Sequence, residues 1–401
     1  MSDLQGNTIV LGVSGGIAAY KSVELLRALQ KKGADVFVVM TENACKFVGE
    51  LTFQAISKHS VYTDVMKEDS PDKIRHIDLA EKADAVVIAP ATANIIGKIA
   101  NGIADDALST MIMAVKAPVM ICPAMNSWMY ESRAVQRNLD TLSEDGFYII
   151  DPDEGYLACN VTGPGRLPDP YYIADRVEAM LVRKDFKKKN VLVTAGPTVE
   201  PIDPVRFISN HSSGKMGYKI AEAFEKRGAK VTIVSGPVSI EPPYNTEVVN
   251  IKTADEMLLK CQERMERIDI IVKVAAVADY KIKNRAEHKI KKSEGGLDLV
   301  LEENPDIIKT LGKLKKPGQI FVGFAAETRD LEQNALKKLE SKNLDMIVAN
   351  EISGKNSAFG SEENKVTIFT KNKAPKILDM MDKKVLADLI LDSILEIENG
   401  R

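Results

Sequence analysis

Short continuous apolar runs alternate with segments of helical periodicity through the first half of the chain. The apolar runs cover residues 8–13, 35–40, 85–89 and 118–122. Between the first two runs, residues 17–32 carry apolar side chains at helical spacing, and Gly33 ends that pattern. Continuous apolar strands separated by helices are typical of a parallel sheet covered on both faces. Right-handed crossovers then predict a doubly wound α/β fold.

The pattern breaks down between residues 151 and 170, where glycine and proline are dense. A loop of this length inside a compact domain is usually functional or disordered. A helix is expected over residues 173–182. The charged stretch 183–189, with five basic residues, is interpreted as a solvated linker.

The alternation restarts at Asn190. Strands are expected over residues 191–195, 230–235, 269–274, 319–324 and 345–348, and helices over 214–227, 253–267, 331–341 and 383–397. A chain of 401 residues also exceeds what one hydrophobic core usually serves. We therefore predict an α/β protein with two doubly wound, Rossmann-like domains, residues 1–189 and 190–401.

Composition narrows the class of protein. Hydrophobic residues make up 45% and charged residues 28% of the chain, as in folded proteins, and the net charge of −3 gives no field for holding nucleic acid. The four cysteines form no Cys-x-x-Cys pair, and no signal peptide or membrane-spanning stretch is evident. We expect a cytoplasmic protein with neither nucleic-acid nor membrane partners.

Polar residues follow three of the expected strands in the first half. Ser14-Gly15-Gly16 forms a strand-to-helix turn, Thr41 follows the second strand, and Thr92 and Asn94 follow the third. Ligands of open parallel sheets bind beyond the carboxyl ends of the strands, and glycines at a helix start let the backbone approach an anion. The Gly-x-Gly-x-x-Gly fingerprint of dinucleotide-binding proteins is absent. The three polar strand ends therefore predict a nucleotide-like cofactor, and FMN would suit them.

Several motifs between residues 7 and 182 resemble those of flavin-dependent cysteine decarboxylases. They are Pro123-Ala-Met-Asn126-Ser-Trp-Met129, His76 in Ile-Arg-His-Ile, Ala91-Thr-Ala-Asn94, the segment 100–106, and Cys159 ahead of Gly163-Pro-Gly-Arg166. The resemblance implies a flavodoxin-like domain that binds FMN. The candidate FMN-binding residues are Ser14, Gly15, Gly16, Thr41, Thr92, Asn94 and Ser109.

The same resemblance implies three catalytic residues. His76 acts as a base or orients the substrate carboxylate, Asn126 binds that carboxylate, and Cys159 donates a proton. Asn160 stands where the family usually has glycine. The sequence therefore does not decide whether the turn after Cys159 has the family's backbone conformation. Each residue also has a structural interpretation when it is taken alone. A lone histidine such as His76 is more often structural, a free cysteine such as Cys159 is usually a small buried hydrophobe, and Asn126 could be the N-cap of a helix over residues 127–139.

A polar, glycine-rich loop precedes the first helix of the second half. It is not a P-loop, because Met216 occupies the Ser/Thr position that would bind Mg2+. The region from Asn190 onward resembles phosphopantothenoylcysteine synthetase. The matching motifs are Asn210-His-Ser-Ser-Gly-Lys-Met-Gly217, Ala275-Ala-Val-Ala-Asp279-Tyr280, Lys289-Ile-Lys-Lys292, Asn304-Pro-Asp-Ile307 and Gly323-Phe-Ala-Ala-Glu-Thr328.

That resemblance implies a CTP-dependent ligase. Asn210 would hold an acyl-cytidylate, Lys289 would serve the attack by cysteine, and Asp279 would bind Mg2+. The implied CTP-binding residues are Ala275, Asp279, Lys289, Pro305, Asp306, Ile307, Ile308, Phe324, Lys338 and Lys342. Lys337 beside Lys338 leaves the choice between these two lysines open.

Together the resemblances imply a bifunctional enzyme of coenzyme A biosynthesis. Its ligase domain would join 4′-phosphopantothenate to L-cysteine with CTP, and its decarboxylase domain would convert the product to 4′-phosphopantetheine with FMN. They also imply a homo-oligomer, with a trimer-based flavin domain and a dimeric ligase domain. A nicotinamide-dependent oxidoreductase and a non-catalytic flavoprotein that acts as a regulatory subunit are the alternatives.

Overall fold

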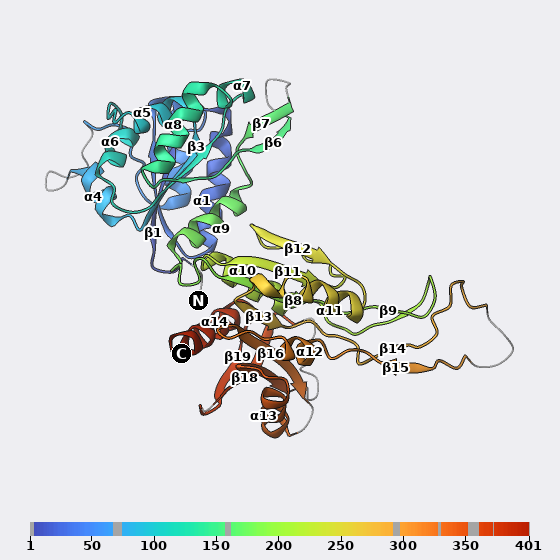
Figure 1. Ribbon diagram of the computed structural model, residues 1–401. Helices are drawn as coiled ribbons and strands as arrows, with labels where there is room; N and C mark the ends of the chain where they lie inside the picture. Colours follow the sequence, from blue (N-terminus) through green and yellow to red (C-terminus); the bar gives the residue numbers. More distant parts are fainter. Residues whose placement is uncertain are drawn as a thin grey trace. The chain divides into compact units, whose positions relative to one another are not determined.

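The chain forms two compact units, residues 1–182 and 183–401. The computed structural model, drawn in Figure 1, describes residues 4–66, 74–156, 162–291, 297–327, 330–351, 361–371 and 373–400. Residues 183–189, expected to be a linker, belong to the second unit in this division.

A five-stranded, all-parallel sheet forms the centre of the first unit. Its order is β2-β1-β3-β4-β5, with bounds β1 Thr8–Val13, β2 Asp35–Met40, β3 Ala85–Ala91, β4 Val119–Pro123 and β5 Tyr148–Ile149. Alternate residues of β1 pack into hydrophobic clusters on opposite faces: Ile9 and Leu11 face one and Val10 the other. The doubly wound parallel fold predicted for this half is confirmed.

Helices cover both faces of this sheet. They are η1 Ile17–Tyr20, α1 Lys21–Lys31, α2 Glu42–Cys45, α3 Glu50–Ser57, α4 Arg75–Lys82, α5 Ala93–Ala100, α6 Ala107–Ala114, α7 Ser127–Tyr130, α8 Arg133–Glu144 and α9 Pro170–Leu181. The helix expected over residues 127–139 is two helices, because the Ser132 side chain accepts a hydrogen bond from Val135 N and starts α8 as its N-cap.

The glycine- and proline-rich segment contains a hairpin that the sequence pattern did not predict. Its strands are β6 Asp153–Tyr156 and β7 Thr162–Arg166, paired antiparallel. Four of the nine residues in these strands are glycine or proline, which hides the strand periodicity.

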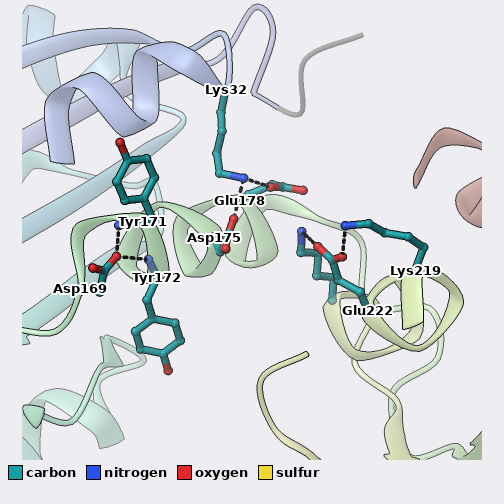
Figure 2. Close-up of polar contacts among 9 residues, drawn as sticks. Lys32, Asp169, Tyr171, Tyr172, Asp175, Glu178, Lys219 and Glu222 are labelled. Carbon is teal, nitrogen blue, oxygen red and sulfur yellow. Dashed lines mark hydrogen bonds and ion pairs between the residues drawn. The ribbon is translucent and has the colours of Figure 1, made fainter. Parts of the chain in front are cut away.

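Charged side chains tie α9 to the end of α1 (Figure 2). Lys32 Nζ lies 2.6 Å from Asp175 Oδ1 and 2.8 Å from Glu178 Oε2. Asp169 caps α9, since its side chain accepts hydrogen bonds from the backbone N–H groups of Tyr171 and Tyr172. Both contacts fix the helix that follows the β6–β7 hairpin.

The second unit contains an eight-stranded mixed sheet of order β12-β11-β8-β13-β16-β17-β18-β19. The first six strands are mutually parallel, and β18 and β19 extend the sheet antiparallel. The bounds are β8 Asn190–Ala195, β11 Lys230–Ser235, β12 Thr246–Asn250, β13 Ile270–Lys273, β16 Ile320–Glu327, β17 Met346–Glu351, β18 Glu363–Thr370 and β19 Lys376–Asp382. Five of the six parallel strands agree with the prediction, whereas β12 and the two antiparallel strands were not predicted.

The helices of this unit are α10 Lys215–Lys226, α11 Ala254–Gln262, η2 Met265–Arg267, α12 Ile307–Lys313, α13 Leu331–Ser341 and α14 Lys383–Asn399. Four further short strands, β9 Glu200–Pro201, β10 Phe207–Ile208, β14 Tyr280–Ile282 and β15 Leu301–Glu303, pair as β9–β10 and β14–β15. Figure 1 shows β9, β14 and β15 on an arm that extends from the large sheet.

A buried ion-pair network joins the start of the second unit to its body. Arg227 binds Asp185 through two hydrogen bonds of 2.8 and 2.6 Å and lies 2.7 Å from Asp392. Its guanidinium group also lies 5.0 Å from the centroid of the Phe186 ring. The segment before β8 is therefore held by specific contacts. Within the described residues, no helix has the length and apolarity needed to cross a membrane.

Candidate active sites

A cavity of about 990 Å³ opens at the carboxyl ends of β1, β2, β3 and β4 in the first unit. Seven of the residues predicted for the flavin site line it: Ser14, Gly15, Gly16, Thr41, Thr92, Asn94 and Asn126. The structure thus brings together residues that are up to 112 positions apart in the sequence. This is the place where doubly wound sheets bind their ligands.

Ser14 fixes the ends of two neighbouring strands. Its buried hydroxyl donates to the Pro90 carbonyl oxygen at 2.8 Å and accepts a hydrogen bond from the Thr92 backbone N–H at 3.0 Å. These contacts tie the turn after β1 to the turn after β3. Ser14 therefore shapes the cavity floor, because its hydroxyl is already bonded within the protein.

Two helices begin at this cavity without a side-chain cap. Gly16 precedes η1 and Thr92 precedes α5, and neither side chain bonds the first turn of its helix. Backbone N–H groups at such ends suit an anion or a polar ring edge. Gly15 has no room for a side chain, since a Cβ there would lie 2.4 Å from Asn43 Cβ.

The β6–β7 hairpin contacts the segment that contains Asn126. The Met125 N–H donates to the Gly165 carbonyl at 3.0 Å. A Cβ at Gly165 would lie 2.1 Å from Met125 O, and one at Gly163 would lie 2.6 Å from Ser127 Oγ. Glycine is therefore required at both hairpin positions for this close approach.

Asn126 itself caps a helix. Its Oδ1 accepts a hydrogen bond of 2.9 Å from Trp128 N, at the start of α7. The side chain nevertheless lines the cavity. Capping and ligand binding are therefore compatible at this position, since the amide nitrogen is separate from the capping oxygen.

Two predicted residues of the first unit lie outside this cavity, and a third falls outside the described residues. His76 lies on α4, outside the cavity lining, and its buried Nδ1 has no hydrogen-bond partner among the described residues. Ser109 also lies outside the lining, because its backbone and side chain form a capping box with Asp106. Cys159 and the neighbouring Asn160 fall outside the described residues.

Sequence reasoning missed a charged group at the edge of this cavity. Lys98 Nζ lies 2.6 Å from Asp105 and 2.7 Å from Asp106, and all three residues line the cavity. Although burial raises the pKa of Asp106, its bonds to Lys98 and Ser109 lower it overall. The segment 100–106 was noted in the sequence, but these charge partners follow only from the fold.

A second cavity, of about 750 Å³, lies at the carboxyl ends of β8 and β13 in the second unit. Ten of the residues predicted for the ligase site line it: Asn210, Ala275, Asp279, Pro305, Asp306, Ile307, Ile308, Phe324, Lys338 and Lys342. Segments from four separate motifs therefore meet at one cavity.

Amide side chains connect the loops around this cavity. Asn210 Nδ2 donates to the Ala276 carbonyl, and its Oδ1 accepts from Ser212 N at 3.0 Å. Asn304 Nδ2 donates to the Ala278 carbonyl at 2.9 Å, while its buried Oδ1 has no partner among the described residues. The loop 275–279 is thereby held from both sides.

An ion pair joins two further predicted residues. Lys342 Nζ lies 2.9 Å from Asp306 Oδ2, and Asp306 Oδ1 caps α12 by accepting a hydrogen bond from Lys309 N. Although burial raises the pKa of Asp306, Lys342 and the backbone N–H lower it overall. Asp306 is thus ionised and already partnered.

Lys289 is the predicted ligase residue that lies outside the cavity. It is exposed on the arm, next to Ile290. Asp203 holds this part of the arm, because its carboxylate accepts hydrogen bonds from Ile290 N and from the Arg206 side chain, and Arg206 donates to the Ile290 carbonyl. These bonds lower the pKa of Asp203 far below its ordinary value.

Lys273 lines the second cavity and was missed by sequence reasoning. It ends the strand Ile270–Lys273, and its Nζ donates to the Ala275 carbonyl at 2.8 Å. A lysine that closes an apolar run is a weak signal, since most such lysines point into solvent. Only the fold places this one beside Lys338 and Lys342.

Family models match both halves of the chain. The model for the DNA/pantothenate metabolism flavoprotein C-terminal domain matches residues 186–397, and the Flavoprotein model matches residues 1–182. The chain is 49% identical over 395 residues to the coenzyme A biosynthesis bifunctional protein of Bacillus subtilis, covering 98% of this chain and 97% of the relative. The corresponding protein of Escherichia coli is 45% identical over 396 residues, with 98% and 97% coverage.

Solved structures resemble the halves separately. The C-terminal domain of a coenzyme A biosynthesis bifunctional protein is 40% identical, with 54% of this chain and 98% of that chain covered and a TM-score of 0.47. The FMN-dependent cysteine decarboxylase SpaF is 32% identical, with 44% and 97% covered and a TM-score of 0.40. On the two family models and the full-length relatives, this chain belongs to the family of bifunctional coenzyme A biosynthesis proteins.

Proposed function

We propose that this protein carries out two successive steps of coenzyme A biosynthesis. The second unit joins 4′-phosphopantothenate to L-cysteine with CTP, and the first unit decarboxylates the product to 4′-phosphopantetheine with FMN. The observation that carries this proposal is the presence of two cavities in one chain, each lined by the motif residues of one activity. The near full-length identity to bifunctional relatives favours it over a non-catalytic regulatory flavoprotein.

In the ligase reaction, a substrate carboxylate oxygen attacks the α-phosphorus of CTP and pyrophosphate leaves with the electron pair. The amine of cysteine then attacks the acyl carbon, and CMP leaves. Lys338 and Lys342 offset the negative charge of the triphosphate. Asn210 has a second N–H bond besides the one given to Ala276, and this bond can be donated to the acyl oxygen as charge develops there.

Mg2+ fits this site as a companion of the nucleotide. Among the described residues there is no group of three or more His, Cys, Asp or Glu side chains that could hold a metal. Asp279 is exposed and lines the cavity, which supplies one carboxylate. Mg2+ usually takes one or two carboxylates together with phosphate oxygens and water. We therefore assign Asp279 to a metal bound mainly by CTP.

FMN fits the first cavity. The uncapped helix starts at Gly16 and Thr92 offer backbone donors, Thr41 and Asn94 offer polar side chains, and Gly15 leaves the backbone open to close approach. When bound, FMN would supply two-electron redox chemistry at the substrate carbon that bears the thiol. The protein holds the substrate carboxylate near Asn126 and supplies protons.

Each of the two sites also needs residues that do not line its described cavity. We propose that His76 reaches the cavity of a neighbouring copy in a trimer-based flavin domain, and that Cys159 donates the final proton. In the same way, Lys289 on the exposed arm would act at a site of a partner copy in a dimeric ligase domain. A cytoplasmic location suits reduced thiols such as the free Cys45, Cys122 and Cys261.

The test incubates the purified full chain with 4′-phosphopantothenate, L-cysteine and either CTP or ATP. We expect flavin absorption bands from the protein, and mass spectrometry should show 4′-phosphopantetheine, CO2 and pyrophosphate with CTP. Omission of cysteine should stop product formation. A protein without flavin bands refutes the decarboxylase half, and one that forms no cysteine adduct with either nucleotide refutes the ligase half.

A further inference from the structure

Arg75 is the first residue of α4 and restrains the turn that carries His76. The residue before α4 is Ile74, whose side chain caps no backbone group of the helix. One nitrogen of the Arg75 guanidinium group, Nη2, donates to the Ser60 carbonyl oxygen at 2.7 Å and to the Ser60 hydroxyl at 2.8 Å. Uncapped helix ends open easily, so these contacts stabilise the end of α4 at which His76 stands.

The segment to which Arg75 binds is firmly held by the central sheet. The Arg75 guanidinium carbon lies 5.2 Å from the centroid of the Tyr62 ring, and Tyr62 is only 1% exposed. The backbone of Tyr62 accepts a hydrogen bond of 2.8 Å from Met40 N and donates one of 3.0 Å to the Val38 carbonyl, both in β2. Arg75 therefore connects α4 to the sheet that carries the flavin cavity.

The two ends of α4 are held in different ways. Leu79 and Ala80, near its end, are buried in the hydrophobic cluster on one face of the sheet. His76 lies one turn earlier and is only partly exposed, and its buried Nδ1 has no hydrogen-bond partner among the described residues. Since no bond at Nδ1 orients the imidazole ring, its direction depends on the backbone of the first turn, which the Arg75 contacts restrain.

We propose that Arg75 is a positioning residue for His76, which holds the start of α4 so that the imidazole ring keeps one direction toward the substrate carboxylate. This inference rests on the proposed decarboxylase function, in which His76 acts as a base or orients that carboxylate. Placement of such a group is critical, because a displacement of about 1 Å can lower a rate about a hundred-fold. Arg75 itself contacts neither substrate nor cofactor in this role.

The test replaces Arg75 in the full chain by alanine, which removes the guanidinium contacts. Lys82→Ala is the matched control, because Lys82 is exposed at the other end of α4 and its ion pair with Asp78 lies on the surface of the same helix. The rate of CO2 release is measured at saturating 4′-phosphopantothenoylcysteine. FMN content and the pyrophosphate release of the ligase half report whether each unit is intact.

We expect Arg75→Ala to lower the rate of CO2 release by about ten-fold to a hundred-fold. FMN content and pyrophosphate release should equal those of the wild type. Guanidinium chloride at low millimolar concentration should restore part of the rate, because the free ion can occupy the place against Ser60 and Tyr62, whereas sodium chloride should not. Unchanged CO2 release, an equal fall in Lys82→Ala, a parallel loss of FMN, or no recovery with guanidinium overturns the inference.

The reactivity of the imidazole ring provides a second measurement that does not depend on turnover. Diethyl pyrocarbonate acylates imidazole nitrogens, and peptide mass spectrometry reads each of the four histidines of the chain separately. His76 should react faster in Arg75→Ala than in the wild type, whereas the exposed His211 and His288 of the second unit should react equally in both proteins. Equal reactivity of His76 in the two proteins refutes the positioning role.

The outcomes separate this inference from the proposed function. If the wild type releases CO2 from 4′-phosphopantothenoylcysteine but Arg75→Ala matches its rate, only the role of Arg75 is refuted. If the wild type itself releases no CO2, the decarboxylase half of the proposed function is refuted, and the role of Arg75 with it.

Discussion

Asn210 donates a hydrogen bond of 2.6 Å from Nδ2 to the backbone carbonyl of Ala276. The bond joins the loop before α10 to the loop after β13. The two residues are 66 positions apart in the sequence, and both line the ligase cavity. Because an amide nitrogen carries two N–H bonds, the second remains for a ligand. The same side chain therefore ties the two loops together and presents a donor to the cavity.

Replacement of Asn210 by aspartate tests the two hydrogen-bond donors without changing the size of the side chain. The side chain keeps its size but loses both donors, and its carboxylate is placed against the Ala276 carbonyl. We expect amide formation to fall by about a hundred-fold or more, as when a donor to a developing oxyanion is removed. Pyrophosphate release and cysteine-adduct formation are measured separately. Asn250→Asp, at the exposed end of β12, is the control; near-normal ligation by Asn210→Asp would remove Asn210 from the mechanism.

Gly15→Ala tests the contact that shapes the flavin cavity. The new methyl carbon would lie 2.4 Å from Asn43 Cβ, so the turn after β1 has to shift, at a cost of about 1–3 kcal/mol. We expect the purified variant to carry less FMN, measured as the ratio of flavin to protein absorbance. Gly49→Ala serves as the comparison, because nothing lies within 4 Å of a Cβ at that position. Equal flavin content in both variants would show that the turn does not contact the cofactor.

Arg227 should be a major contributor to the stability of the second unit. Arg227→Met leaves the Asp185 carboxylate buried without its partner, and we expect a loss of about 3–5 kcal/mol. Asp392 is about half exposed, so Asp392→Asn should cost about 1 kcal/mol or less. Scanning calorimetry of the full chain measures both, with flavin fluorescence as the control for the first unit. Similar losses for the two variants would contradict the buried-pair explanation.

Acid stability offers a test of the α10 surface (Figure 2). Although burial raises the pKa of Glu222, Lys226 and Lys219 outweigh this and lower it to about 2 from an ordinary value of 4.5. The ionised form therefore stabilises the folded protein above pH 4.5, and this contribution is lost as the pH falls from about 4.5 to about 2. Glu222→Gln should be less stable than the wild type at pH 7 and equally stable near pH 2. Urea unfolding across this range measures the difference, and a constant difference would refute the assigned pKa.

The parallel sheets were predictable because buried parallel strands are continuous apolar runs, such as Thr8–Val13 and Lys230–Ser235, whose bounds agree with the structure. The two antiparallel strands Glu363–Thr370 and Lys376–Asp382 were not, because exposed and buried residues are mixed in them and the run is not apolar. In the β6–β7 hairpin, pairing is determined by tertiary contact of glycines, which leaves no periodicity in the sequence.

The residues of the candidate sites also divide into those that the sequence could place and those that it could not. Residues adjacent to strand ends, such as Thr41 and Ala275, could be placed because the carboxyl edge of a sheet is defined by the strands themselves. Lys273 could not, because its position beside Lys342 depends on how α12 and α13 meet the sheet. His76 and Lys289 carry motif signals, yet they lie outside the cavities of their own units.

The glycines that seat the β6–β7 hairpin against Met125 and Ser127 also limit how the decarboxylase half can be re-engineered. Gly163 and Gly165 leave no gap in which either segment can change alone. A library that alters substrate range by randomising residues 123–129 should therefore yield few active members unless the hairpin is varied with it. Paired randomisation of the two segments is the more productive design, because it lets compensating changes arise together.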